Sequence, residues 1–202
     1  MLTIALPKGR IADETLDRFE KAFGEKFVFE DRKLILEKSG FKFLNVRNQD
    51  VPTYVMHGAA DLGVVGLDVL EEKEYDLIKL LDLKLGRCKV AFGLRTGEKL
   101  NFDKSKITIA TKHEKIAKKY FEQKAMAVEI IKLYGSIELA PLVGLCDCIV
   151  DIVETGETMK QNGLEVGPTI METTAHLIAN KNSFYAKKDL IFDLKDKLEK
   201  YL

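Results

Sequence analysis

Short apolar runs alternate along the chain with segments in which apolar residues recur at helical spacing. Residues 2–6 form the first apolar run and Pro7 ends it, which predicts a buried strand. Apolar residues then recur every third or fourth position through residues 12–23, and Gly24 follows, so we expect an amphipathic helix there. The chain therefore opens with a strand–turn–helix unit.

The same alternation continues along the chain and predicts the α/β class. Further strands are expected at residues 27–29, 34–36, 41–46, 77–81, 88–94, 107–110, 127–133, 148–153, 164–171 and 174–180. Further helices are expected at 51–57, 115–124, 138–143 and 190–202, and residues 61–70 should form a strand, a glycine turn and a helix. The two short runs at 27–29 and 34–36 are candidates for a hairpin.

A polar, turn-rich stretch at residues 96–106 is a candidate boundary between two lobes. We expect lobe I to comprise residues 1–95 and 176–202, and lobe II to comprise residues 96–175. Each lobe would be an α/β unit, and a cleft would lie between them.

The composition narrows the possible function classes. With 46% hydrophobic residues, 32% charged residues and a formal net charge of zero, the chain is typical of a soluble globular protein without a broad basic surface. No apolar run has membrane-spanning length, and residues 1–10 lack a signal-peptide pattern. Cys146 and Cys148, with one residue between them, have the wrong spacing for a zinc knuckle or a redox motif. We therefore expect a cytoplasmic protein whose partners include neither nucleic acid nor membrane.

The strand at residues 148–153 leads into a Thr-Gly-Glu-Thr turn, residues 155–158, and then a short helix. The first amides of a helix have no intrahelical acceptor, and the helix dipole favours an anion beside them. Gly156 permits close backbone approach, while Asp151 and Glu154 could accept hydrogen bonds from sugar hydroxyls. A sugar phosphate fits this pattern. The alternative is an ordinary buried strand with a well-capped turn, because short motifs also match by chance.

Basic residues follow several of the predicted strands. Lys8 and Arg10 lie in the turn after the first strand, and Arg32 and Arg47 also lie beside strand ends. Ligands of open α/β sheets bind at the carboxyl ends of strands, and arginine recognises phosphates with two hydrogen bonds. These residues predict a shared anion pocket, although each alone could be a surface charge. Thr111 and Lys112 also lie at a strand end and could add an anion contact, whereas His113 is expected to be a capping or surface residue rather than a catalyst.

Four blocks of the sequence have a pattern in common with one enzyme family. They are residues 6–10 (LPKGR), 46–55 (VRNQDVPTYV), 60–68 (ADLGVVGLD), and 138–144 (ELAPLVG) leading into 151–159 (DIVETGETM). Together they resemble the ATP phosphoribosyltransferase family, and the last block resembles its signature. Cys146 departs from the pattern, since the family usually has Ala or Gly there, and His113 departs where Tyr is expected.

The resemblance implies a fold like that of type II periplasmic binding proteins, with the active site in the cleft between the lobes. It also implies the first reaction of histidine biosynthesis. In that reaction, N1 of the adenine of ATP attacks C1 of 5-phosphoribosyl 1-diphosphate, and pyrophosphate leaves. The length resembles the short form of the family, so no C-terminal regulatory domain is expected. The short form works with a histidyl-tRNA-synthetase-like regulatory subunit. We therefore expect a homodimer within a hetero-oligomer, and Mg²⁺ that accompanies the diphosphate without a dedicated protein metal site.

The candidate site residues are grouped by the substrate or leaving group that each is expected to contact. Phosphoribosyl diphosphate is expected to contact Asp151, Glu154, Thr155, Gly156, Glu157, Thr158 and Glu138. The catalytic cations around pyrophosphate are expected to be Lys8, Arg10, Arg32 and Arg47. ATP is expected to contact Lys8, Arg10, Arg47, Asp68 and Thr111.

Two other classes remain open. A two-lobed solute- or effector-binding protein without catalysis would share the fold, but it would normally be exported and would not need the loop of residues 151–158. A ligand-sensing regulatory domain would normally be attached to a DNA-binding segment, and the sequence leaves no helix-turn-helix region for one.

Overall fold

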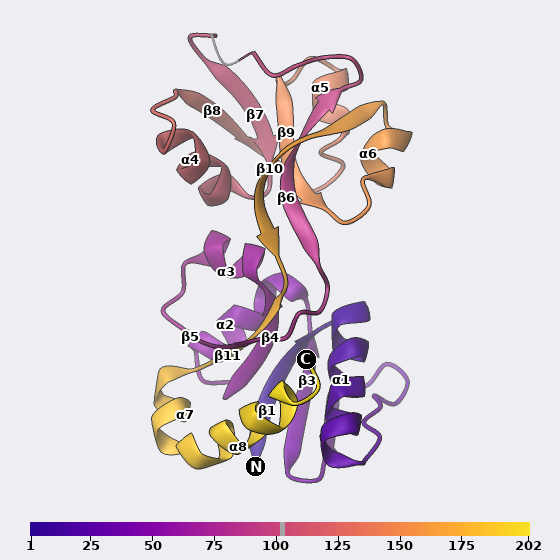
Figure 1. The fold of residues 1–202 in the computed structure, drawn as a ribbon, viewed down its shortest axis with the longest axis vertical. Coiled ribbons are helices and arrows are strands. Elements are labelled where there is room, and N and C mark those ends of the chain that lie inside the picture. Colours follow the sequence, from indigo (N-terminus) through magenta and orange to yellow (C-terminus); the bar gives the residue numbers. More distant parts are fainter. Residues whose placement is uncertain (102–103) are drawn as a thin grey trace. The chain divides into compact units, whose positions relative to one another are not determined.

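The computed structural model describes residues 1–101 and 104–202, and they form two compact units. Unit 1 comprises Met1–Arg87 and Thr174–Leu202, and unit 2 comprises Cys88–Thr173. Each unit is built on one sheet of mixed strand direction with helices packed against it (Figure 1). The predicted α/β class with two lobes is confirmed.

The sheet of unit 1 has the strand order β2-β3-β1-β4-β11-β5. Its strands are β1 (Leu2–Pro7), β2 (Ile35–Lys38), β3 (Phe41–Val46), β4 (Leu62–Gly66), β5 (Ile78–Asp82) and β11 (Ala175–Ala179). Strand β1 is parallel to both β3 and β4, whereas β2 and β11 pair with their neighbours in antiparallel fashion. Three parallel strands therefore end at one edge of this sheet.

Helices pack on both faces of the unit 1 sheet. They are α1 (Arg10–Phe23), the 3₁₀ turn η1 (Asn48–Asp50), α2 (Val51–Met56), α3 (Leu67–Lys73), α7 (Lys181–Ala186) and α8 (Lys188–Glu199). The apolar stripes of α1 and α8 share one core cluster, and α2 and α3 share the cluster on the opposite face. Successive strand residues point to opposite faces, so Ile4 joins the first cluster and Ala5 the second.

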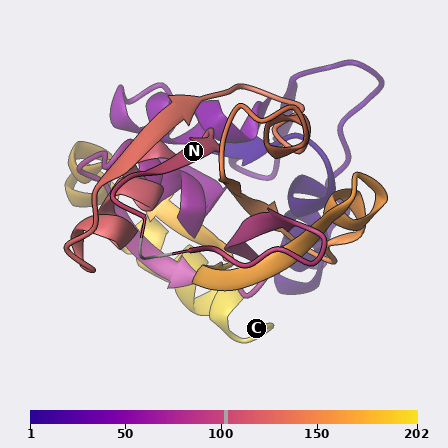
Figure 2. The ribbon, with the colours of Figure 1, turned by 90° about the horizontal axis from the view of Figure 1, so that it is seen from above.

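The sheet of unit 2 has the strand order β10-β6-β9-β7-β8. Its elements are β6 (Cys88–Arg95), β7 (Ile107–Thr111), α4 (Glu114–Glu122), β8 (Val128–Lys132), α5 (Leu139–Leu142), β9 (Cys148–Val153), α6 (Glu157–Gln161) and β10 (Leu164–Thr173). Strand β7 is parallel to β8 and β9, while β6 runs antiparallel to β9 and β10. The paired strands β6 and β10 can be followed side by side in Figures 1 and 2.

Helix α4 packs on one face of the unit 2 sheet, and α5 and α6 pack on the other. Cys146 and Cys148 are buried in these cores. Burial raises the pKa of the Cys148 thiol to about 12. A thiol with so high a pKa is a packing residue rather than a nucleophile.

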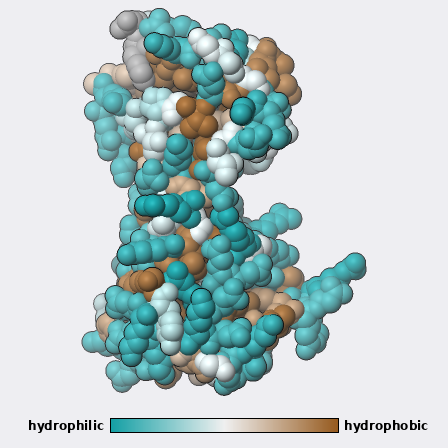
Figure 3. Space-filling view, turned by 45° about the vertical axis from the view of Figure 1, so that its right-hand side comes forward, coloured by the Kyte–Doolittle hydropathy of each residue, from teal (hydrophilic) through white to brown (hydrophobic). Residues whose placement is uncertain are grey.

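Charged and polar residues dominate the surface drawn in Figure 3, where hydrophobic residues form small, separate patches. In unit 2 the exposed apolar residues include Leu139, Val143 and Leu145, around α5. Among the residues that the structure describes, no helix is both long enough and apolar enough to cross a bilayer.

Unit 1 differs from the sequence-based expectation in two features. Residues 27–29 form no strand, and β2 pairs with β3 instead, so the predicted hairpin is wrong. Phe27 is only 3% exposed and its ring packs 5.4 Å from that of Phe43, so this apolar run fills the core without a ladder partner. Helix α7 was not expected; it is capped by Asn180, whose side chain accepts a hydrogen bond from the amide of Ser183 at 3.0 Å.

The division between the units also differs from the expected boundary. The first crossing lies between Arg87 and Cys88, before β6, rather than after residue 95. Strand β6 pairs along its length with β9 and β10, so hydrogen bonding places the whole strand in unit 2. The return crossing, between Thr173 and Thr174, lies close to the expected residue 175.

Candidate functional site

The parallel strands of unit 2 bring a group of polar residues to one edge of its sheet. Strands β7, β8 and β9 all end there, and antiparallel β6 begins there, with Lys89 opposite Val153. A cavity of about 310 Å³ lies at this edge and is lined by Cys88, Glu138 and residues 151–159. Every residue expected to contact phosphoribosyl diphosphate therefore lines one cavity. Their contact with that substrate stays a prediction.

The loop after β9 is anchored at both ends and exposed between them. Val153 and Met159 are buried, whereas Glu154, Thr155 and Thr158 are exposed. Gly156 has φ 82°, and a Cβ there would lie 2.8 Å from Cγ2 of Val166. Glycine is therefore required for both its conformation and its lack of a side chain. Strand, glycine turn and helix α6 follow in the order that the sequence predicts.

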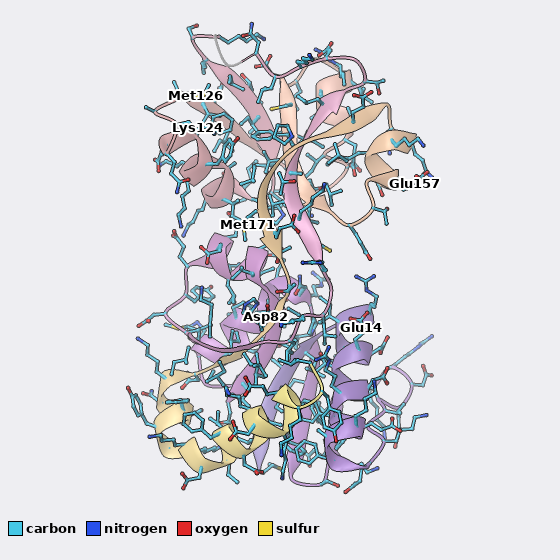
Figure 4. The ribbon with its side chains drawn as sticks, in the orientation of Figure 1. Glu14, Asp82, Lys124, Met126, Glu157 and Met171 are labelled. Carbon is cyan, nitrogen blue, oxygen red and sulfur yellow. The ribbon has the colours of Figure 1, made fainter. Side chains whose placement is uncertain are left out.

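The exposed loop offers hydrogen-bond donors to a ligand. The amides of the first turn of α6 have no earlier helical acceptor, and Thr158 adds a hydroxyl. The amide of Glu157 lies 3.3 Å from Oγ1 of Thr155, which steadies the turn. Oε1 of Glu157 accepts a hydrogen bond from Nε2 of Gln161 at 3.1 Å, and this side chain lies on the outside of the unit (Figure 4). An anion can therefore meet the donors of the loop.

Asp151 lies in β9, on the cavity wall, and two residues that follow β7 lie beside its carboxylate. Its Oδ1 is 3.0 Å from Nζ of Lys112 and 3.8 Å from Nε2 of His113. His113 is only 1% exposed, so the expectation of a surface residue is wrong. It is the N-cap residue of α4, although its side chain makes no cap hydrogen bond.

Thr111 joins β7 to β9 beneath the cavity. Its fully buried hydroxyl donates to the carbonyl of Val150 at 2.6 Å and accepts from the amide of His113 at 2.9 Å. The hydrogen bond that this hydroxyl donates and the one that it accepts both hold the end of β7 in place. The expected contact between Thr111 and ATP stays a prediction, and the structure gives this hydroxyl a structural role.

Unit 1 presents cations at the corresponding edge of its own sheet. Pro7 is in register with Val46, and the amide of Lys8 donates to the carbonyl of Val46 at 2.8 Å. Lys8 and Arg47 therefore follow neighbouring parallel strands, and both are exposed. Arg10 begins α1 one turn further on, with Nε 3.5 Å from Oε1 of Glu14. Lys8, Arg10 and Arg47 therefore lie at one edge of this sheet, and their shared anion pocket stays a prediction.

Arg32 and Asp68 also lie near this edge of unit 1. The carbonyl of Leu34 accepts from the amide of Asn45 at 2.8 Å, which places the loop before β2 beside the end of β3. Arg32 is exposed in that loop and has φ 51°, in the left-handed region. Asp68 lies in the first turn of α3, directly after β4, and is buried. Their proposed substrate contacts stay predictions.

Two contributors to the unit 2 edge have positions that the sequence does not predict. Cys88 lines the cavity because β6 starts opposite the end of β9. Lys112 was read as a ligand contact, whereas its ammonium pairs with Asp151. Strand pairing decides both positions, and no local sequence signal could have revealed it.

Comparison with known proteins places the chain in a family. The family model described as ATP phosphoribosyltransferase matches residues 47–200. An ATP phosphoribosyltransferase of Wolinella succinogenes is 67% identical over 200 residues, which covers 99% of this chain and 97% of the relative. One from Sulfurovum sp. is 65% identical and covers 98% of this chain and 97% of the relative. The relatives are thus chains of about the same, short length.

Solved structures agree with this assignment. The ATP phosphoribosyl transferase (HisG:HisZ) complex from Thermotoga maritima contains a chain that matches with a TM-score of 0.84 and 36% identity, covering 99% of this chain and 98% of that one. The aliphatic sulphonate binding protein SsuA from Escherichia coli matches with a TM-score of 0.64 at 13% identity, covering 98% of this chain and 67% of that one. This second likeness shows the fold alone and confirms the predicted resemblance to periplasmic binding proteins.

The relatives and the family model together cover the signature segments from which the resemblance was first drawn. Their agreement favours catalysis over the two binding-protein alternatives. The chain belongs to the ATP phosphoribosyltransferase family, whose members are pentosyltransferases that carry out the first step of histidine biosynthesis.

Proposed function

We propose that the chain uses the cavity edge of unit 2 to hold 5-phosphoribosyl 1-diphosphate during the ATP phosphoribosyltransferase reaction. The observation that carries this proposal is the single cavity that brings Glu138 and Asp151 together with the loop of residues 154–158. The 5-phosphate would meet the amides and hydroxyls of the loop. The ribose hydroxyls would meet the carboxylates of Asp151 and Glu138.

The transfer reaction requires positioning of the two substrates and stabilisation of the charge that develops. A bond forms between N1 of adenine and C1 of the ribose, while the bond from C1 to the diphosphate oxygen breaks and pyrophosphate departs. Positive charge develops on the sugar and negative charge on the leaving group. Lys8, Arg10, Arg32 and Arg47 are proposed to stabilise pyrophosphate and the ATP triphosphate. Asp68 and Thr111 complete the proposed ATP contacts.

Magnesium is proposed to enter with the diphosphate. The carboxylates that line the cavity are oxygen ligands, which suit Mg²⁺. Within residues 1–101 and 104–202, no cluster of three or more potential ligands is arranged to hold a metal ion. Mg²⁺ usually keeps several waters and binds through few carboxylates plus substrate phosphates. Asp151 and Glu138 are the residues proposed to contact such bound water.

A second subunit is part of the proposal. The Thermotoga maritima structure is a complex of HisG with HisZ. We infer that this chain likewise forms a homodimer within a hetero-oligomer that includes a histidyl-tRNA-synthetase-like regulatory subunit. The cytoplasm, where ATP and phosphoribosyl diphosphate are available, is its proposed location.

An ultraviolet assay of adenine absorbance tests the reaction and the partner together. The chain is mixed with ATP, 5-phosphoribosyl 1-diphosphate and Mg²⁺, with and without the candidate regulatory subunit. The expected result is an absorbance change that requires both substrates and increases when the partner is bound. Reactions that omit one substrate are the controls. No change in a folded chain with the partner bound would contradict catalysis and favour a binding protein that has kept the fold.

A further inference from the structure

Lys112 follows β7 at the cavity edge of unit 2, and its charge is directed at a protein carboxylate. Its Nζ lies 3.0 Å from Oδ1 of Asp151, the same oxygen that accepts the amide of Ile152 at 2.8 Å. Nε2 of His113 faces this oxygen at 3.8 Å. These three contacts of the Asp151 carboxylate all use Oδ1. The carboxylate is therefore held through this oxygen.

The backbone beneath this pair is fixed. The buried hydroxyl of Thr111 ties the end of β7 to the carbonyl of Val150, the residue before Asp151 in β9. The same hydroxyl accepts from the amide of His113, so both neighbours of Lys112 are held in place. The Asp151 side chain is 14% exposed and that of Lys112 is 35% exposed. An ion pair on such a base loses less entropy than one between two mobile surface side chains.

The acidic lining of the cavity makes a neighbouring cation such as Lys112 important for binding an anionic substrate. The cavity lining includes the acids Glu138, Asp151, Glu154 and Glu157, and no lysine or arginine. A substrate with several negative phosphates would be repelled by the charge of these carboxylates. The ammonium of Lys112 offsets the charge of the acid that lies deepest in β9.

We propose that Lys112 is a positioning residue of the ATP phosphoribosyltransferase reaction, which holds Asp151 through Oδ1 so that Oδ2 accepts a hydroxyl of the phosphoribosyl group. The inference rests on the proposed placement of that group at the unit 2 cavity. It differs from the reading of Lys112 as a phosphate ligand, because the lysine acts on the substrate only through Asp151. It restricts the carboxylate to the orientation that the sugar requires.

The variant Lys112→Met tests this role, since it removes the ammonium and keeps most of the stem. The expected result is a rise of about tenfold in KM for 5-phosphoribosyl 1-diphosphate, with kcat and KM for ATP changed by less than about twofold. Lys112→Arg, which keeps a cation, should restore most of the affinity. If Lys112→Met does not fold, as judged by circular dichroism, Lys112→Gln serves the same test.

Lys106→Met is the matched control. Lys106 precedes β7 at the opposite end of the strand, and its Nζ lies 2.8 Å from Oε2 of Glu129. This variant removes an ion pair from the same sheet without touching the cavity lining. Its kinetic constants should equal those of the unmodified chain. An equal rise in KM for both lysine variants would show a general effect of lost ion pairs and would overturn the positioning role.

A double-mutant cycle with Asp151→Asn separates positioning from direct binding. If Lys112 works through Asp151, adding Lys112→Met to Asp151→Asn should raise KM no further. Effects that multiply would show that Lys112 contacts the substrate itself and would overturn the inference. An Asp151→Asn variant with an unchanged KM for 5-phosphoribosyl 1-diphosphate would instead overturn the placement of the substrate. The failure of the inference and that of the proposed function are therefore distinguishable.

Discussion

The two units place loops at the same kind of strand edge but equip them with different chemistry. In unit 1 the ends of β1 and β3 carry Lys8 and Arg47, exposed cations on long side chains. In unit 2 the ends of β7 and β9 carry acids, hydroxyls and backbone amides around a cavity, and Asp151 is held by its neighbours. The sheet edge supplies a location in both units, while the loop residues decide what each location can bind.

This difference predicts that substitutions in the two units impair the reaction in different ways. Exposed cations contribute charge, so their loss should weaken the stabilisation of the leaving pyrophosphate. Anchored acids and amides contribute orientation, so their loss should weaken binding of the phosphoribosyl group. Turnover and KM can separate the two, because an interaction made only in the transition state changes kcat.

The largest expected effect comes from unit 1. Arg47→Ala should lower kcat by about 100-fold, because one donor to developing charge is worth about that much. The measurement is steady-state kinetics by adenine absorbance. Lys38→Ala is the control, since Lys38 ends β2 at the other edge of the same sheet. An unchanged kcat in Arg47→Ala would remove this residue from leaving-group stabilisation.

A smaller effect is expected in unit 2. Thr158→Ala should raise KM for 5-phosphoribosyl 1-diphosphate by about tenfold and leave kcat nearly unchanged, because one hydroxyl donor to a charged phosphate is lost. Thr169→Ala serves as the control, since Thr169 is an exposed threonine of β10 that does not line the cavity. Normal affinity of Thr158→Ala for the substrate would exclude the hydroxyl from the phosphate site. A fall in kcat at constant KM in Thr158→Ala would contradict the proposed difference between the units.

The smallest effect concerns folding of unit 1. Burial raises the pKa of Asp61, but hydrogen bonds from Lys187 and from the amide of Thr3 outweigh burial and leave the pKa lowered. Nζ of Lys187 lies 2.7 Å from Oδ2 of Asp61 and joins the segment before β4 to the start of α8. Because the folded pKa lies below the unfolded one, this stabilisation is present above the usual carboxyl range and is lost as the pH falls through the folded pKa.

Asp61→Asn should therefore lower the free energy of unfolding by about 1 kcal/mol near neutral pH. The difference from the unmodified chain should shrink at about pH 3. Urea denaturation followed by circular dichroism at the two pH values measures this. The cavity residues of unit 2 are untouched, so KM for 5-phosphoribosyl 1-diphosphate should stay constant. A stability difference independent of pH would show that Asp61 acts by packing rather than by charge.

Local patterns determined much of the fold. The first strand and helix, β1 and α1, follow directly from apolar spacing, and the Thr-Gly-Glu-Thr turn after β9 was expected at its observed place. Such elements depend on residues that are close in sequence, so spacing and turn residues are sufficient to predict them. Glycine at position 156 was expected for the same reason, since a positive φ is a local requirement.

Tertiary structure determined the conformation of those segments whose partners lie far away in the chain. Residues 27–29 have strand-like composition but contribute Phe27 to the core instead, because β3 already pairs with β2 and β1. Strand β6 belongs to unit 2 because its hydrogen bonds reach β9 and β10. A sequence window contains neither of these partners.

The candidate site divides in the same way. The sequence by itself determined which residues follow strand ends, and hence that Lys8, Arg47 and the loop of residues 154–158 lie at sheet edges. Only the tertiary structure decided that Lys112 reaches Asp151 and that His113 is buried beside it. The physical reason is strand order: β7 and β9 are distant in the chain but hydrogen-bonded in the sheet, so their side chains meet only after the sheet has formed.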